Sequence, residues 1–110
     1  MATITFKRKE LEEFIGKSRP IEELVNAFEM LGMPVDKFNE EEITADVTTD
    51  RVGMYTVEGA GRAIGLFLGL KEPKKYRPES SKIVMTIDKV AARPYAVAFA
   101  AKGVKIDEAF

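Results

Sequence analysis

An apolar stripe bounded by helix-breaking residues restricts the fold of this chain more than any other feature of its sequence. The apolar side chains recur every three or four residues, which places them along one side of a helix: Ile21, Leu24, Val25, Phe28 and Leu31. Ser18 is placed to cap the start of this helix, with Pro20 in its first turn, and Gly32 followed by Pro34 ends it. A helix with one apolar side needs a second layer to cover that side.

The segment before this helix has the pattern of a strand followed by a short helix. Residues 2–6 mix threonine with apolar residues and predict the strand. Apolar side chains then return at helical spacing at positions 11, 14 and 15. Gly16 suits the left-handed conformation that ends many helices, so we expect the short helix to stop there.

The segment after the long helix predicts a β-hairpin and a third helix. Apolar residues at positions 43, 45 and 47 alternate with polar ones, which gives a strand with one wet face, and residues 39–41 supply the turn. An irregular loop over residues 49–55 follows. Thr56 is placed to cap the third helix and Gly69 to end it.

Two apolar runs near the C-terminus predict further strands, over residues 82–88 and 93–106. In the second run large apolar residues alternate with alanines, a pattern suited to burial on both faces of a sheet: Tyr95, Val97 and Phe99. We expect the sheet that contains them to cover the apolar stripe of the long helix.

Together these elements predict one small α+β domain over residues 1–110, with three helices packed on a mainly antiparallel sheet. The length of 110 residues and the 45% hydrophobic content allow one modest core. Charged residues interrupt every apolar stretch well before the roughly 18 residues that a membrane span needs, and residues 1–10 have no signal-peptide core. We therefore expect a cytoplasmic protein without a membrane partner.

The absence of cysteine and histidine excludes disulfides, thiolate nucleophiles, Cys/His zinc sites and imidazole bases. Asp46, Asp50 and Glu58 carry the carboxylate oxygens that Mg²⁺ prefers, but their spacing is not that of a compact binding loop. Capping by Asp50 and the helix dipole at Glu58 give these residues a structural interpretation. We therefore expect no catalytic residue, no cofactor-binding residue and no metal ligand in this chain.

The glycine-rich segment at residues 58–65 matches the glycine fingerprint of dinucleotide-binding folds only in part. Such a phosphate site needs a buried strand that leads directly into the glycine turn, whereas here a loop intervenes and the strand before it alternates apolar and polar residues. Gly61, Gly65 and Gly69 are four residues apart, which lines them along one helix ridge. We therefore expect these glycines to let another backbone approach closely.

Charge is divided unevenly along the chain. Residues 1–50 hold 12 acidic and 6 basic side chains, whereas residues 51–110 hold 6 acidic and 11 basic ones. Residues 71–81 contain two prolines and predict a long surface connection, in which four cations lie around Tyr76: Lys71, Lys74, Lys75 and Arg77. Cations that meet phosphate and an aromatic ring that stacks on a base suit weak RNA contact, and an ordinary solvated loop is the alternative.

Several motifs follow one another in an order that characterises a known family. They occupy residues 3–11, 22–33, 41–43, 50–63 and 93–105. In this order they resemble the N-terminal domain of the β subunit of phenylalanyl-tRNA synthetase, of the archaeal and eukaryotic type. One departure is that the family commonly has Arg-Pro-Asp where this chain has Arg51, Val52 and Gly53, so that an acidic position is lost.

The resemblance implies a non-catalytic structural and interaction domain of an aminoacyl-tRNA synthetase, phenylalanine-tRNA ligase, which serves protein biosynthesis. The whole enzyme uses ATP and Mg²⁺ to join phenylalanine to tRNA, but its adenylation motifs do not occur in this chain, so we expect the chain alone not to be an enzyme. The implied partners are the remaining β-subunit domains, the α subunit and, through residues 71–77, tRNA. The alternative is a free-standing RNA- or protein-binding module with the same fold.

Overall fold

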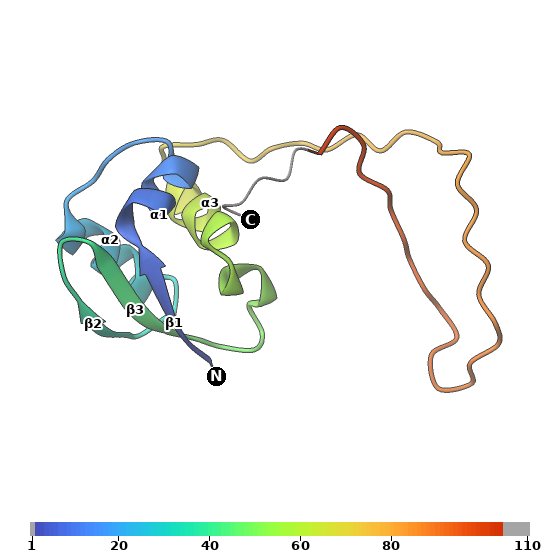
Figure 1. Cartoon of the computed structure of the whole chain (residues 1–110), viewed down its shortest axis with the longest axis horizontal. Helices are drawn as coiled ribbons and strands as arrows, with labels where there is room; N and C mark the ends of the chain where they lie inside the picture. Colours follow the sequence, from blue (N-terminus) through green and yellow to red (C-terminus); the bar gives the residue numbers. More distant parts are fainter. Residues whose placement is uncertain (1, 105–110) are drawn as a thin grey trace. The chain divides into compact units, whose positions relative to one another are not determined.

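The helices and strands all fall within the first of two units into which the chain divides. The computed structural model describes residues 2–104 (Figure 1). The boundary between the units lies between Lys74 and Lys75. The elements of the first unit are β1 (Ala2–Lys7), α1 (Arg8–Ile15), α2 (Ile21–Met30), β2 (Val35–Phe38), β3 (Glu42–Val47), the short 3-10 helix η1 (Val52–Tyr55) and α3 (Val57–Phe67). No described helix has both the length and the apolar character needed to cross a membrane.

The three strands form one antiparallel sheet in the order β1-β3-β2, so that β3 is the central strand. Alternation along β1 and β3 separates an apolar face from a polar one. On the apolar face the paired residues are Ala2 with Val47, Ile4 with Ala45 and Phe6 with Ile43. On the polar face the Thr3 hydroxyl donates to Asp46 Oδ1 at 2.6 Å, and the Thr5 and Thr44 hydroxyl oxygens lie 2.9 Å apart.

The β2–β3 hairpin is confirmed where the sequence predicts it. The side-chain oxygen of Asn39 accepts hydrogen bonds from the backbone N–H groups of Glu41 and Glu42, at 2.8 and 3.0 Å. An asparagine that bonds to the backbone two residues on stabilises a turn. The register of β2 against β3 shifts between Val35 and Lys37.

The helices bury their apolar sides in one core with the apolar face of the sheet. Figure 1 shows α1 and α3 lying side by side. The ring of Phe28 in α2 packs on the ring of Phe6 in β1, with 5.2 Å between their centroids. The larger fully buried side chains come from every layer: Leu11, Ile15, Leu24, Phe28, Met33, Ile43, Val47 and Ile64. The predicted α+β class, with three helices on an antiparallel sheet, is therefore confirmed.

Most of the predicted helix ends are confirmed, and one predicted cap is wrong. Gly16, Gly32 and Gly69 have positive φ at the ends of α1, α2 and α3, and Thr56 accepts a hydrogen bond from Gly59 N–H at 3.2 Å. Ser18 does not cap α2, because Pro20 occupies the N-cap position. The Ser18 hydroxyl instead donates to the carboxylate of Glu12, a charged acceptor that binds more strongly than backbone groups.

The strands predicted over residues 82–88 and 93–106 are wrong for the described part of the chain, which has no strand beyond Val47. Residues 105 and 106 of the second prediction lie outside the described residues. Tyr95, Val97 and Phe99 are 91%, 97% and 94% exposed, so the predicted sheet over the apolar side of α2 is also wrong. The apolar side of α2 is covered by the sheet of the first unit. A strand exists only when a neighbouring strand satisfies its backbone, and alternation of side chains alone does not supply that neighbour.

Replacement of Leu24 tests the core at the centre of the apolar stripe. Leu24 is fully buried, so Leu24→Ala should lower the free energy of unfolding by about 2 to 5 kcal/mol. Met30 lies on the same helix and is 65% exposed, so the control Met30→Ala should change it by less than about 0.5 kcal/mol. Urea unfolding followed by circular dichroism gives both values. Equal losses for the two variants would contradict this packing of α2.

Candidate functional site

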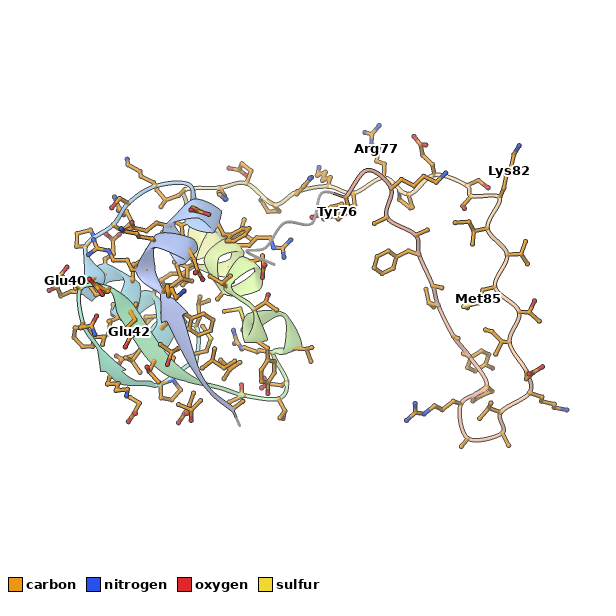
Figure 2. The ribbon with its side chains drawn as sticks, viewed as in Figure 1. Glu40, Glu42, Tyr76, Arg77, Lys82 and Met85 are labelled. Atoms are coloured by element: carbon orange, nitrogen blue, oxygen red, sulfur yellow. The ribbon has the colours of Figure 1, made fainter. Side chains whose placement is uncertain are left out.

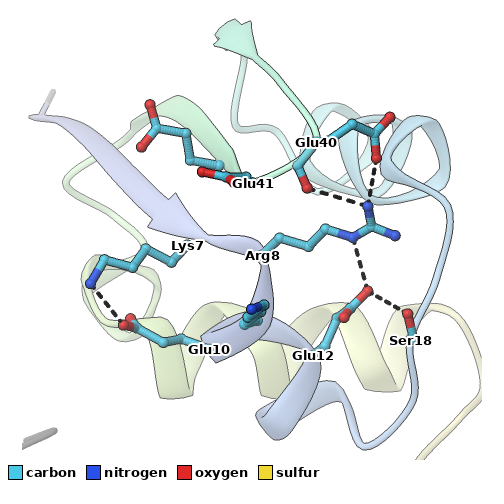
Figure 3. A pocket seen from close by; sticks show the side chains of 9 residues that line it. Lys7, Arg8, Glu10, Glu12, Ser18, Glu40 and Glu41 are labelled. Carbon is cyan, nitrogen blue, oxygen red and sulfur yellow. Dashed lines mark hydrogen bonds and ion pairs between the residues drawn. The ribbon is translucent and has the colours of Figure 1, made fainter.

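A hollow of about 510 Å³ opens where the end of β1, the start of α1 and the β2–β3 turn come together (Figure 3). All the residues that line it are charged except Ser18. The lining residues are Lys7, Arg8, Lys9, Glu10, Glu12, Ser18, Glu40, Glu41 and Glu42. The hollow is a candidate site because it brings cations and carboxylates together.

Arg8 ties three segments of the chain together at this hollow. Its Nε donates to Glu12 Oε1 at 3.0 Å and one Nη donates to the Glu40 carboxylate at 2.8 Å (Figure 3). The other Nη donates to the Arg19 carbonyl at 2.8 Å. The backbone N–H of Arg8 also donates to the Glu41 carbonyl at 2.7 Å. The planar guanidinium suits such a junction, because its donors point in several fixed directions.

Glu12 is the carboxylate on the other side of this junction. It accepts hydrogen bonds from Arg8, from the Ser18 hydroxyl at 2.9 Å and from the Arg19 N–H at 3.1 Å. Partial burial alone would raise the pKa of Glu12, but the hydrogen bonds and the Arg8 charge outweigh it and hold the pKa below its ordinary value. The hydrogen bond to Glu12 is likewise the main reason why the pKa of Arg8 is raised.

Neither member of this pair is suited to transfer protons near neutral pH. A general acid or base works best when its pKa lies near the working pH. The pKa of Arg8 is raised and that of Glu12 is lowered, so both pKa values move away from neutral pH. Each of the three side-chain nitrogens of Arg8 donates a hydrogen bond to an oxygen of the chain itself. The arrangement therefore acts as a structural clamp between α1, the segment before α2 and the β2–β3 turn.

The three carboxylates considered for Mg²⁺ lie in separate places. Asp46 on β3 accepts the hydrogen bond of Thr3 on the polar face of the sheet. Asp50 lies in the loop after β3, where a hydrogen bond from the Thr48 side chain and one from its own N–H lower its pKa. Glu58 lies in the first turn of α3. In the part of the chain that the structure describes, no three acidic residues gather closely enough to hold a metal ion.

The glycines of α3 serve the close packing that their spacing predicts. A Cβ added to Gly61 would lie 2.6 Å from Phe14 Cβ and 3.0 Å from the Leu11 carbonyl oxygen, and one added to Gly65 would lie 3.4 Å from the Ile15 carbonyl oxygen. Gly61 and Gly65 therefore let α3 approach the backbone of α1. Gly69 does not join them, because an added Cβ there would meet nothing within 4 Å.

The four cations of the predicted RNA contact differ in their surroundings. The Lys71 ammonium donates to the Phe14 carbonyl at the C-terminal end of α1. A cation there satisfies a free carbonyl and matches the negative end of the helix dipole. Lys74 ends the first unit, whereas Lys75 and Arg77 belong to the second. Lys71 thus has a structural role, and RNA contact by the four residues stays a prediction.

Sequence reasoning missed Arg8, Glu12 and Glu40. The spacing of Arg8 and Glu12, four residues apart on one helix, is a signal that points to their ion pair. The same spacing joins Arg19 to Glu23, at 2.6 Å. Spacing alone is not sufficient, because Glu58 and Arg62 share it and are not among the ion pairs found within residues 2–104.

Comparison with known proteins shows that the chain is similar to β subunits of phenylalanine-tRNA ligase. The chain is 31% identical to the phenylalanine-tRNA ligase β subunit of Methanosphaera stadtmanae, over 98% of this chain and 20% of that protein. The β subunits of Metallosphaera sedula and Archaeoglobus fulgidus are 31% and 26% identical, over 100% and 98% of this chain and 20% of each relative. The chain thus spans about a fifth of the length of these curated relatives.

A solved structure has the same fold. It is the crystal structure of an N-terminal fragment of the phenylalanyl-tRNA synthetase β subunit from Pyrococcus horikoshii, with a TM-score of 0.59 and 24% sequence identity. The match covers 74% of this chain and 25% of that one. No protein-family model matches the chain.

The clamp predicts a particular pH dependence of stability. Because the pKa of Glu12 is lower in the folded chain than its unfolded value of about 4.3, its contribution is present above that pH and is lost as pH falls through the folded pKa. Glu12→Gln should cost about 1 to 2 kcal/mol at pH 7, and the difference from wild type should shrink toward pH 3. Urea unfolding at a series of pH values measures this.

The matched control is Glu10→Gln on the same helix. Glu10 pairs with Lys7 at 3.2 Å in an exposed position, so its loss should cost less than about 0.5 kcal/mol at any pH. A Glu12→Gln deficit that stayed constant between pH 7 and pH 3 would contradict the assigned role of the Glu12 charge.

Proposed function

We propose that this chain, which is related to the N-terminal domain of the phenylalanine-tRNA ligase β subunit, is a non-catalytic structural and interaction domain of such a ligase. The observation that carries the proposal is the match of 98% of the chain to about a fifth of a β subunit. In this proposal the whole ligase, with ATP and Mg²⁺, joins phenylalanine to tRNA in the cytoplasm, and the chemistry takes place outside this chain.

The use of the polar groups supports a structural role. Arg8 and Glu12 hold three segments together, the glycines of α3 allow α1 to approach, and Lys71 bonds to the end of α1. These are the clusters that most resemble functional sites, and each is engaged in the fold. Polar groups whose hydrogen bonds all go to other parts of the chain stabilise the fold, and they are not positioned to act on a substrate.

The apolar side chains of the second unit support an interaction role. Within residues 82–104 many large apolar residues are at least half exposed, among them Val84, Tyr95, Val97 and Phe99. Large apolar side chains that remain exposed in numbers generally mark an interface with another surface. The proposed partners are the remaining domains of the β subunit, and through them the α subunit.

A chimeric enzyme tests the structural role. The region of the Methanosphaera stadtmanae β subunit that this chain matches is replaced by the chain, and the product is expressed with its α subunit. We expect the chimera to form a complex with α and to charge tRNA with phenylalanine, because a shared fold should support the same contacts. A β subunit from which the region is deleted should assemble poorly. Equal assembly and activity of the deleted and chimeric subunits would contradict the proposal.

The isolated chain serves as the catalytic control for this experiment. It should show no phenylalanine-dependent exchange between ATP and pyrophosphate above background, because the chain has neither the adenylation motifs of the family nor any histidine or cysteine. The assembled ligase provides the positive control. Exchange that scales with the concentration of the chain, and that disappears in Glu58→Ala, would contradict a non-catalytic role.

Weak tRNA contact is a second candidate role, favoured by the excess of basic residues after position 50. Phosphate contacts release counterions, so binding should weaken steeply with salt and should be no tighter than about 10⁻⁴ to 10⁻⁶ M. A variant with Lys74→Ala and Lys75→Ala should bind less tightly and depend less on salt. Fluorescence titration of tRNA at two salt concentrations measures both effects.

The control for this titration removes the same charge elsewhere, through Lys89→Ala and Lys102→Ala. Equal losses in the two double variants would indicate a general charge effect and would contradict a site at residues 71–77. Tight binding that does not respond to salt would instead indicate base recognition by other residues.

A further inference from the structure

The second unit contains two extended apolar runs joined by a turn. The runs cover residues 82–88 and 93–104, and the turn is closed by a hydrogen bond from the Arg93 N–H to the Val90 carbonyl at 3.1 Å. In Figure 1 the orange run leads out to this turn and the red run returns from it. Figure 2 shows side chains standing out from both runs, with Lys82 and Met85 on the first.

The turn explains why the two runs do not pair with each other. Its central residues are Ala91 and Ala92, and among the described residues only glycines have positive φ. A two-residue hairpin that matches the twist of paired strands needs positive φ at its first central residue, and other turns splay the strands. The backbone groups of residues 94–104 accordingly form no backbone hydrogen bond with other described residues.

The two runs differ in the faces that they present. In the second run Tyr95, Val97 and Phe99 are more than 90% exposed on one side, and alanines occupy the other side. In the first run the side opposite Ile83, Met85 and Ile87 contains Thr86 and Asp88 and is therefore partly polar. Only the second run has two apolar faces, and this is the pattern of a strand buried on both sides.

Charge marks the ends of the second run. Between Arg93 and Lys102 the chain has eight uncharged residues, which would span roughly 26 Å as a strand. Cations at both ends can remain in solvent while the middle is covered. Within the first unit, helices α1 to α3 and the apolar face of the sheet bury one another in a core of their own.

We propose that residues 93–104 add as an inner strand to a β-sheet in the remainder of the β subunit, with Tyr95, Val97 and Phe99 under one covering layer and the alanines under another. The inference rests on the proposed function. An inner strand forms main-chain hydrogen bonds with a neighbouring strand on each side and fits its alternate side chains into the layers above and below the sheet. We assign the partner sheet to the β subunit because the relatives match this segment and are about five times as long as the chain.

The test compares three substitutions in the isolated chain and in the chimeric β subunit with its α subunit. Val97→Asp places a charge on the large face of the run, Ala98→Asp places one on the small face, and Thr86→Asp is the control on the polar face of the first run. In the isolated chain all three should leave the melting temperature unchanged. In the chimera, amide hydrogen exchange of residues 93–104 should be slowed at least ~100-fold relative to the isolated chain. Val97→Asp and Ala98→Asp should each abolish this protection, whereas Thr86→Asp should keep it.

Each other result overturns the inference. Rapid exchange of residues 93–104 in a chimera that assembles and charges tRNA would leave the proposed function intact and reject the inner strand. Disruption by Val97→Asp but not by Ala98→Asp would show a strand covered on one face only. Concentration-dependent association of the isolated chain that Val97→Asp removes, without protection in the chimera, would make a second copy of the chain the occupant. A chimera that forms no complex would reject the proposed function and, with it, the β subunit as the partner.

Discussion

The antiparallel pairing of β1 with β3 is the constraint on which the rest of the first unit depends. It joins segments about forty residues apart and puts Phe6 beside Ile43 on the apolar face that the helices cover. The register continues until Lys7 pairs with Glu42, so that Arg8 begins α1 directly opposite the β2–β3 turn. The guanidinium of Arg8 can therefore bond to that turn and to Glu12 together, which fixes the direction in which α1 leaves the sheet.

The charged groups and glycines that first suggest chemistry mostly stabilise this arrangement. Glu12 is kept ionised by donors from three neighbours, and the close approach of α1 and α3 depends on the missing side chains of Gly61 and Gly65. The use of these groups to stabilise the fold agrees with the proposed structural and interaction role in a ligase.

The two units present different kinds of surface. The first has a filled core and exposes mainly polar and charged side chains, as an independently stable unit should. The second exposes large apolar side chains along an extended backbone, which is costly in water and becomes favourable only when another layer covers them. The proposed inner strand would resolve this cost through the same main-chain pairing that joins β1 to β3.

Sequence alone determined the features whose cause is local. Positive φ at Gly16 and Gly32, the cap at Thr56 and the turn at Asn39 depend on a few neighbouring residues, and the relation to the β subunit rests on motifs in chain order. Tertiary structure decided the contacts between distant segments, such as Arg8 with Glu40 and Lys71 with the end of α1. It also decided that the alternating run after Arg93 is no strand within the described chain. Periodicity specifies which side chains share a face, but a strand or an ion pair forms only where the fold brings its partner within hydrogen-bonding distance.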